Sequence, residues 1–500
     1  MRYSAGVGFV LIATPLAAQT SAPLSKAAAT ITTLEVARRI GIIADDSMMG
    51  RDTPSKGLER TAQYVADQFQ RFGLRPGGDS LSWFQRYPIS RRRLDLERSR
   101  VIFTGGGTER AASFRSAARL VLGKVPERPL SGTVVLLSGP ISGEAVEELK
   151  VAGKVVLLPF GTANLARPET EEGARALLAA GPKALLLLAD VDSATFAKKI
   201  PARAQERTVV GGVDQAPTVE VRAEPVVAAL RAAGIDLSAA RSAQVTTARE
   251  VAGLTVQIDM RDSVISSRHA PNTVGILEGS DPKLKNEYVV YSAHMDHIGI
   301  TSGQADSINN GADDDASGTA GVIELAEAFS RPGARPKRSI IFLTVSGEEK
   351  GLWGSNYFVN KPPVPIDQIV ANINMDMIGR NWADTIVAIG KEQSDLGATL
   401  DRVNAAHPEL RMTAIDDRWP EERFYFRSDH YNFARKGVPI LFFFNGVHED
   451  YHEVTDSPDK INSEKEARIL RLIFYLGQEI GNAPKRPAWK PESYEEIVEE

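Results

Sequence analysis

Apolar strands without polar alternation constrain the fold from Val251 onward. Candidate strands such as "EYVVYSA", "SIIFLTVS" and "IVANINM" lack the polar residue at every second position that is typical of a strand with one solvent-exposed face. Segments of helical periodicity separate them, including Ala316–Ser330 and Glu464–Ile480. Because strands buried on both faces need helices on both sides, the sequence predicts an α/β fold over residues 251–485, with a mixed, mostly parallel sheet between helices.

The rest of the chain shows three other sequence patterns. Residues 34–94 show helical periodicity, and we predict that they form the N-terminal helical part of the same domain. Residues 95–247 contain short strand-like runs such as "KVVLLPF" between glycines and prolines, which indicates an inserted β-rich domain. Residues 486–500 are charged and rich in proline, and we predict a C-terminal tail there.

The first residues predict export. Residues 1–18 contain one arginine, an apolar run and then small residues, which is the layout of a signal peptide, so we expect a periplasmic or extracellular protein. The apolar run is shorter than the roughly 20 residues that a membrane-spanning helix needs, and no later segment qualifies, so we expect no stable membrane span.

Composition excludes two kinds of site. The 500 residues include no cysteine, so a disulfide framework and thiolate metal ligands are excluded. The net charge is −5, and the basic residues are scattered along the chain. A nucleic-acid partner is therefore not expected, because binding to phosphate backbones requires a concentrated basic surface.

Histidine and carboxylate side chains follow the predicted strands. In open α/β sheets, ligands bind beyond the carboxyl ends of the strands, so these side chains are expected to converge. They are His294, the triplet Asp313–Asp315, the pair Glu348–Glu349, Asp376 and His452. Imidazole and carboxylate groups together suit Zn²⁺ and related ions, and the helix predicted to open at Ala316 aims its positive dipole end at the acidic triplet. The sequence therefore predicts a metal site.

The same stretches resemble a known family. The ordered motifs "HMD", "GADDDASG", "GEEKGLWGS", "NMDMIG" and "YHEVTDSPDKI" are similar to those of peptidase family M28, the co-catalytic zinc aminopeptidases, from Val251 to Gly481. The resemblance implies a zinc exopeptidase fold of the phosphorylase/hydrolase-like type, two zinc ions, and peptide substrates with a free N-terminus. Residues 95–247 resemble a protease-associated (PA) domain.

The resemblance also implies a set of metal ligands. Asp313 would bridge the two zinc ions, and a cis peptide bond would join it to Asp314. A bridging anion is needed because dications ~3.5–4 Å apart repel each other. His294 and Asp376 would complete one site, and Glu349 and His452 would complete the other.

Two residues are expected to act on the substrate. Glu348 adjoins a ligand without being one, so it can accept a proton from the attacking water and pass it to the leaving amine. By resemblance, Tyr425 is expected to hydrogen-bond the oxyanion of the tetrahedral intermediate.

Other residues are expected to support the ligands. Asp314 is expected to restrain a neighbouring ligand, and Asp296 to accept the second ring N–H of His294. Support is also expected from Asp429 and His430. His297 and His448 are expected to line the pocket or to have structural roles.

Three alternatives remain open in the sequence. A carboxypeptidase or dipeptidase would use the same site, because the direction of an exopeptidase depends on loops that recognise an amine or a carboxylate, and residues 415–424 are the candidate loop. A single-zinc acyltransferase similar to glutaminyl cyclase would keep the fold. A non-catalytic peptide-binding relative would also keep it, since fold does not fix function.

Overall fold

The computed structural model describes residues 22–141, 149–165, 173–174, 176–178, 180–200, 206–211, 216–303 and 305–499. These residues form two compact units, the first of which comprises the described residues up to Gln85 together with Pro271–Ser355 and Pro363–Ser493. The second unit contains Arg86–Ala270 and two short segments, Asn356–Pro362 and the chain from Tyr494. The predicted signal peptide, residues 1–18, lies outside the described residues.

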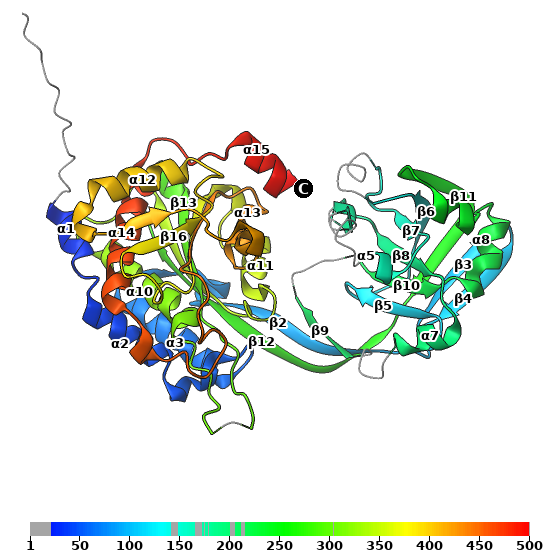
Figure 1. The fold of residues 1–500 in the computed structure, drawn as a ribbon, viewed down its shortest axis with the longest axis horizontal. Coiled ribbons are helices and arrows are strands. Elements are labelled where there is room, and N and C mark those ends of the chain that lie inside the picture. The colour runs from blue at the N-terminus through cyan, green and yellow to red at the C-terminus, as the bar shows by residue number, and fades with distance from the viewer. Residues whose placement is uncertain are drawn as a thin grey trace, which may run out of the picture. The chain divides into compact units, whose positions relative to one another are not determined.

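A mixed sheet forms the centre of unit 1 (Figure 1). Its strands follow the order β17 (Thr413–Ile415), β16 (Thr385–Ile389), β18 (Ile440–Phe443), β15 (Ile369–Met375), β13 (Tyr288–His294), β14 (Ser339–Val345) and β12 (Asp262–Leu277). The pairs β13–β14, β13–β15, β15–β18 and β16–β17 are parallel, whereas β12–β14 and β16–β18 are antiparallel. The predicted α/β fold with a mixed, mostly parallel sheet is confirmed.

Three further strands complete this ten-stranded sheet. They are β1 (Arg75–Pro76), β2 (Phe84–Leu94) and β9 (Glu206–Val210). Short β1 pairs with β12, and β9 pairs with the part of β2 that lies in unit 2. Strands β2 and β12 each run from one unit into the other.

Helices of unit 1 pack against this sheet and against one another. The main helices are α2 (Thr33–Ile43), α3 (Lys56–Arg71), α10 (Gly318–Ser330), α12 (Leu396–Ala406) and α14 (Ser463–Asn482). The shorter ones are α1 (Ala22–Ala28) and α13 (His430–Ala434), and two more, α11 (Trp353–Asn360) and α15 (Pro491–Tyr494), run from unit 1 into unit 2. No described helix is both long and apolar enough to cross a membrane.

Helix α3 shows why the predicted helices form. Its N-cap Ser55 accepts a hydrogen bond from the backbone N–H of Leu58, which satisfies one of the donors left open at a helix start. Leu58, Val65 and Phe69 recur at helical spacing, and all three are fully buried.

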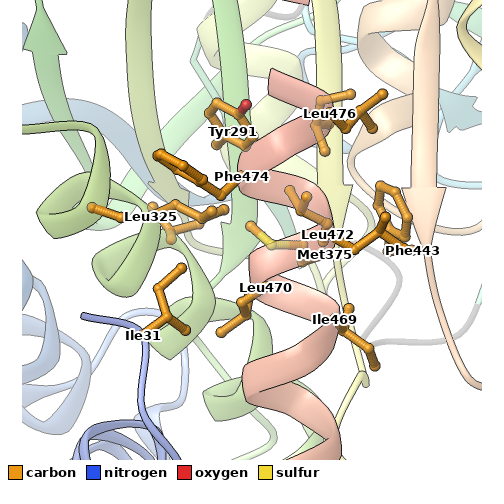
Figure 2. Close-up of a cluster of buried hydrophobic side chains, with 14 of the residues drawn as sticks. Ile31, Tyr291, Leu325, Met375, Phe443, Ile469, Leu470, Leu472, Phe474 and Leu476 are labelled. Carbon is orange, nitrogen blue, oxygen red and sulfur yellow. The ribbon is translucent and has the colours of Figure 1, made fainter. Parts of the chain in front are cut away.

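The main core of unit 1 lies between the sheet and α10 and α14 (Figure 2). Tyr291 of β13, Leu325 of α10 and Phe474 of α14 point into the same buried layer. The rings of Phe329 and Phe474 lie 4.7 Å apart between centroids, which joins the two helices. Burying such rings stabilises the fold by about 1.5–3 kcal/mol each, so α10 and the loop that precedes it are held firmly against the strands.

Unit 2 has its own eight-stranded sheet and its own cores. Its strand order is β4 (Thr108–Ser113), β3 (Arg100–Gly105), β11 (Thr247–Asp259), β6 (Leu130–Ser138), β7 (Val155–Leu158), β8 (Ala184–Ala189), β10 (Thr218–Arg222) and β5 (Ala118–Leu122). The helices around it are α5 (Thr162–Leu165), α7 (Ser193–Lys198), α8 (Val227–Ala232) and α9 (Leu237–Ser242). The resemblance of this unit to a PA domain stays a prediction.

The structure moves the predicted domain boundaries. The strand "GLTVQID", assigned from the sequence to the domain starting at Val251, is the second half of β11 and pairs with β3 and β6 in unit 2. The units separate at Gln85/Arg86 and Ala270/Pro271, rather than at the ends of the predicted insert, residues 95–247. The prediction failed because an apolar strand pattern does not reveal which sheet the strand joins. The predicted tail also divides, after Ser493.

Candidate functional site

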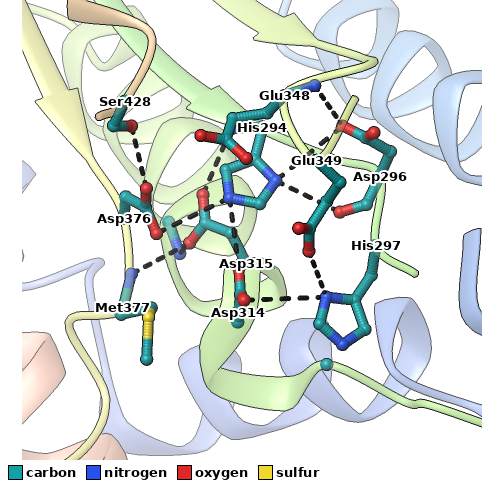
Figure 3. A network of polar contacts seen from close by, with 12 residues as sticks. His294, Asp296, His297, Asp314, Asp315, Glu348, Glu349, Asp376, Met377 and Ser428 are labelled. Carbon is teal, nitrogen blue, oxygen red and sulfur yellow. Dashed lines mark hydrogen bonds and ion pairs between the residues drawn. The ribbon is translucent and has the colours of Figure 1, made fainter. Parts of the chain in front are cut away.

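The carboxyl ends of three parallel strands of unit 1 bring the predicted side chains together (Figure 3). β13 ends at His294, whose register partner on β14 is Val345, and β15 ends at Met375. The residues that follow these strands therefore meet at one edge of the sheet, as expected for ligand sites in α/β folds.

The first cluster is formed by His294, Asp314 and Asp376. His294 Nε2 lies 3.2 Å from Asp314 Oδ1 and 3.6 Å from Asp376 Oδ1. All three residues are buried. Three donor atoms of the predicted chemical types thus face one point.

The second cluster shares Asp314 with the first. Its other oxygen, Oδ2, lies 3.2 Å from His452 Nε2, and that nitrogen lies 3.1 Å from Glu349 Oε2. His297 Nδ1 lies 2.8 Å from Glu349 Oε1, so a second imidazole joins the group. Asp314 therefore presents one carboxylate oxygen to each cluster, and His297, expected only to line the pocket or to be structural, contacts a ligand candidate.

The spacing of these atoms fits a metal ion. Ligands about 2.0–2.1 Å from a tetrahedral Zn²⁺ are separated from one another by roughly 3.3–3.4 Å, close to the distances between these donors. Both ring nitrogens of His297, Nε2 of His452 and Oε1 of Glu349 are buried without a hydrogen bond of normal geometry. Buried polar atoms usually have such a partner, so these donors fit a divalent cation better than they fit each other.

The structure corrects the register of the aspartate triplet. Asp313, predicted to bridge the metals, is outside both clusters, whereas Asp314, predicted to be a supporting residue, contributes to both. The cis peptide bond is likewise one residue further on, between Asp314 and Asp315. The three aspartates are identical and adjacent, so the sequence could not show which of them contributes to both clusters. The path of the backbone determines this.

The other two aspartates tie the surrounding loops together. Asp313 Oδ1 accepts a hydrogen bond from the Gly379 N–H at 2.6 Å, and Oδ2 lies 3.2 Å from His448 Nε2. Asp315 accepts hydrogen bonds from the backbone N–H groups of His294 and Gly318, at 3.1 and 2.8 Å. Asp315 therefore links the end of β13 to the start of α10.

Asp456 holds the backbone of the aspartate triplet, and no role for it was predicted from the sequence. The backbone N–H groups of Asp313 and Asp314 donate to its carboxylate at 3.0–3.1 Å. Burial and the charges of Asp313 and Asp314 raise the pKa of Asp456 to about 6, although these backbone hydrogen bonds act to lower it. Asp456 lies in the quoted stretch "YHEVTDSPDKI", four residues after His452, which was the available signal.

Arg51 is a buried cation behind the site, and no sequence signal pointed to it. Its guanidinium donates to the carbonyls of Met295, Asn310 and Gly311 at 2.9, 2.6 and 2.9 Å. These carbonyls belong to the two loops that carry His294 and Asp314. The side chain is fully buried, so it holds both loops at fixed separation and places a positive charge near the carboxylates.

Asp296 supports His294, but through a different atom from the one predicted. His294 Nδ1 lies 3.2 Å from the backbone carbonyl of Asp296 and 3.8 Å from its carboxylate. The carboxylate accepts hydrogen bonds from Thr53 Oγ1 at 2.9 Å and from the Glu348 N–H at 3.3 Å. Burial raises the pKa of Asp296 to about 6. Asp296 therefore positions the loop that carries Glu348.

A pocket opens beside the two clusters. Its lining combines carboxylates at one end with apolar and aromatic side chains: His294, Asp314, Glu348, Asp376, Met377, Phe424, Arg427, Ser428, Phe442, Phe444, Val447 and Tyr451. Burial and the negative charges of Asp429, Asp376 and Glu349 raise the pKa of Glu348 well above its ordinary value. His294 acts in the opposite direction and lowers this pKa. A divalent cation nearby would favour the charged carboxylate and oppose that shift. Glu348 thus faces the space where a substrate would lie.

Tyr451 occupies the pocket position predicted for Tyr425. Tyr425 is buried, packs edge-on against Phe426 and His430, and is not among the residues that line this pocket. Tyr451 lines it and stacks on His452 at 3.9 Å. Burial and the charges of the site carboxylates raise the pKa of Tyr451, so its hydroxyl stays protonated and can donate a hydrogen bond.

The stretch 428–430 supports one wall of the pocket. Ser428 Oγ donates to Asp376 Oδ2 at 2.8 Å. Asp429 is fully buried, and burial raises its pKa to about 7. His430 donates from Nε2 to the Tyr425 carbonyl at 2.7 Å and stacks on Phe442, so it holds the wall, whereas a contact with a metal ligand was expected.

Comparisons with known proteins agree with this assembly. The family model for peptidase family M28 matches residues 272–477. A leupeptin-inactivating enzyme from Streptomyces exfoliatus is 34% identical over 192 residues, which is 38% of this chain and 38% of that protein. A probable zinc metalloprotease from Pyricularia oryzae is 26% identical over 260 residues, covering 43% of this chain and 50% of that protein. The chain thus matches half or less of the length of these relatives.

Among solved structures, an aminopeptidase from Aneurinibacillus sp. strain AM-1 superposes with a TM-score of 0.47 at 17% identity. The superposition covers 94% of this chain and 98% of that one.

The two clusters predict different effects of neighbouring substitutions. Asp314→Asn should weaken zinc binding at both clusters, because a neutral amide replaces the carboxylate that they share. Asp313→Asn should retain most of the zinc, because the Asp313 carboxylate accepts from the Gly379 N–H and lies beside His448, outside both clusters. Zinc content after dialysis against a graded chelator, measured by plasma mass spectrometry, separates the two variants, with circular dichroism as the control for folding. Equal zinc loss in both would contradict the corrected register.

Proposed function

Residues 272–477 of the chain form a domain of peptidase family M28, and we propose that the protein is a zinc aminopeptidase that removes N-terminal residues from peptides. One observation carries the proposal: Asp314 presents an oxygen to each of two donor clusters, and Glu348 lines the pocket beside them. The predicted export stays a prediction, because residues 1–18 lie outside the described residues.

Two zinc ions fit these donors. His294 and Asp376 would hold one, Glu349 and His452 the other, and Asp314 both; His297 is an additional candidate beside Glu349. When bound, the ions would polarise the scissile carbonyl and lower the pKa of the attacking water.

The pocket suits a substrate with a free amine. An ammonium group entering it meets the carboxylate of Glu348, which belongs to neither donor cluster and attracts it. The side chain of the first residue meets Met377, Phe442 and Phe444, which favour an apolar group. This arrangement supports an aminopeptidase over an enzyme that requires a blocked N-terminus.

The chain's own residues account for the movement of the proton. Glu348 accepts a proton from the attacking water and returns it to the nitrogen of the leaving amine. Tyr451 donates a hydrogen bond to the oxyanion that forms at the scissile carbonyl.

Glu348→Gln tests this proton transfer. The amide keeps the shape of the side chain but cannot accept the proton, so kcat should fall by roughly 10²–10⁴-fold. Zinc content should stay near that of the wild type, because Glu348 is not in either donor cluster. Near-normal turnover in a zinc-loaded variant would show that another residue acts as the base.

The free amine can be tested with matched substrates. The zinc-loaded enzyme should cleave leucine-4-nitroanilide far faster than its N-acetyl derivative, because the acetyl group removes the positive charge that Glu348 attracts. Release of nitroaniline gives kcat/KM for both. Comparable rates for the two substrates would exclude an aminopeptidase.

Tyr451 and Tyr425 form a matched pair for the oxyanion contact. Tyr451→Phe should lower kcat by roughly 10–10³-fold, since one donor to the developing charge is lost, with little change in KM. Tyr425→Phe should leave kcat within a few-fold, because Tyr425 does not line the pocket. The reverse ranking of the two variants would restore Tyr425 to the role predicted from the sequence.

A further inference from the structure

The pocket carries a positive charge for which the proposed reaction has no use. Of the described residues that line it, Arg427 is the one with a permanently charged cationic side chain. The acidic end of the pocket accounts for recognition of an amine, and the apolar wall accounts for a side chain. A guanidinium in the same lining therefore indicates a second charged group on the substrate, of opposite sign to the amine.

The backbone holds Arg427 close to the reaction centre. Its neighbour Ser428 donates to Asp376 Oδ2 at 2.8 Å and accepts from Asn374 Nδ2 at 3.2 Å. The Cα atoms of Arg427 and Ser428 are about 3.8 Å apart across a trans peptide bond. Arg427 thus starts one residue away from a contact with a candidate metal ligand.

The guanidinium is oriented but not neutralised. It lies over the ring of Phe424, 4.7 Å from the centroid, so one face is supported and the N–H groups at the edge remain available for a carboxylate. Glu422 Oε2 is 3.7 Å from Nη1, and 48% of the Arg427 side chain and 57% of the Glu422 side chain are exposed. Exposed pairs of this kind hold a side chain weakly, so a substrate anion can replace Glu422.

We propose that Arg427 binds a carboxylate of the substrate on the leaving-group side of the scissile bond, so that the enzyme prefers dipeptides with a free C-terminus. This inference rests on the proposed aminopeptidase function. Arg427 is exposed, as expected for the side from which the leaving group departs. An extended residue spans about 3.3–3.6 Å, so the C-terminal carboxylate of a dipeptide lies within reach of an arginine anchored beside the site.

The test compares peptides that carry a carboxylate at different positions with one that carries none. They are Leu-Gly, its C-terminal amide, Leu-Glu-amide and Glu-Gly-amide, with kcat and KM measured for the zinc-loaded wild type. Leu-Gly should be cleaved with a kcat/KM about tenfold above that of Leu-Gly-amide, mainly through KM. Equal values for all four substrates would overturn the proposal.

Variants assign the effect to Arg427. Arg427→Gln should bring the ratio of Leu-Gly to Leu-Gly-amide near one, and Arg427→Lys should restore part of it, because lysine keeps the charge but loses the bidentate geometry. Arg435→Gln is the matched control: Arg435 is also exposed and lies over an aromatic ring, that of Tyr431, but does not line the pocket. A tenfold ratio that survives in Arg427→Gln would overturn the proposal.

Other outcomes identify the source of the anion or separate the two proposals. A preference for Leu-Glu-amide over Leu-Gly-amide that is lost in Arg427→Gln would support the carboxylate subsite and assign it to an acidic side chain of the leaving residue. A preference for Glu-Gly-amide that is lost in Arg427→Gln would place the anion on the first residue and overturn the proposal. If none of the four peptides is cleaved, the aminopeptidase proposal fails. Calorimetric titration of zinc-loaded Glu348→Gln with Leu-Gly and its amide still decides the subsite: tighter binding of Leu-Gly supports it, and equal binding overturns it.

Discussion

Repulsion among buried carboxylates is the constraint on which the site depends. Asp314, Glu349 and Asp376 are brought within a few ångströms of one another by three strand ends and the start of α10, and burial deprives them of water. Such a group is stable only with positive charge nearby. Imidazoles, the N-terminus of α10 and the zinc that we propose to bind here would supply it. The donor geometry is therefore as much a requirement of folding as of catalysis.

Arg51 and Asp456 make that geometry rigid. The guanidinium of Arg51 joins the loop after β13 to the loop before α10, and Asp456 binds the backbone of Asp313 and Asp314 from the other side. Each acts on backbone groups, so both fix where the ligand side chains start. The packed core between α10, α14 and the sheet also restrains these loops. Precision at the site thus comes from elements that never touch a substrate.

Much of the fold was predictable because it follows from local patterns. Strands β13, β14 and β15 read as apolar runs, and α3 and α14 as amphipathic helices, since periodicity and burial are properties of short segments. The partner of β11 was not predictable. Its sequence looks like the strands of unit 1, yet it pairs in unit 2, because strand pairing is decided by residues distant in the sequence.

The sequence by itself determined the chemistry of the site: histidines and carboxylates follow each strand, and parallel strands must bring their carboxyl ends to one edge. The tertiary structure decided which atoms meet. Asp314 instead of Asp313 faces both clusters, and Tyr451 instead of Tyr425 faces the pocket. His297, expected to line the pocket or to be structural, contacts Glu349, and Arg51 joins the site although no role was predicted for it. The sequence gives the residue type at each position. The direction of a side chain depends on the path of the backbone, which contacts between distant residues fix.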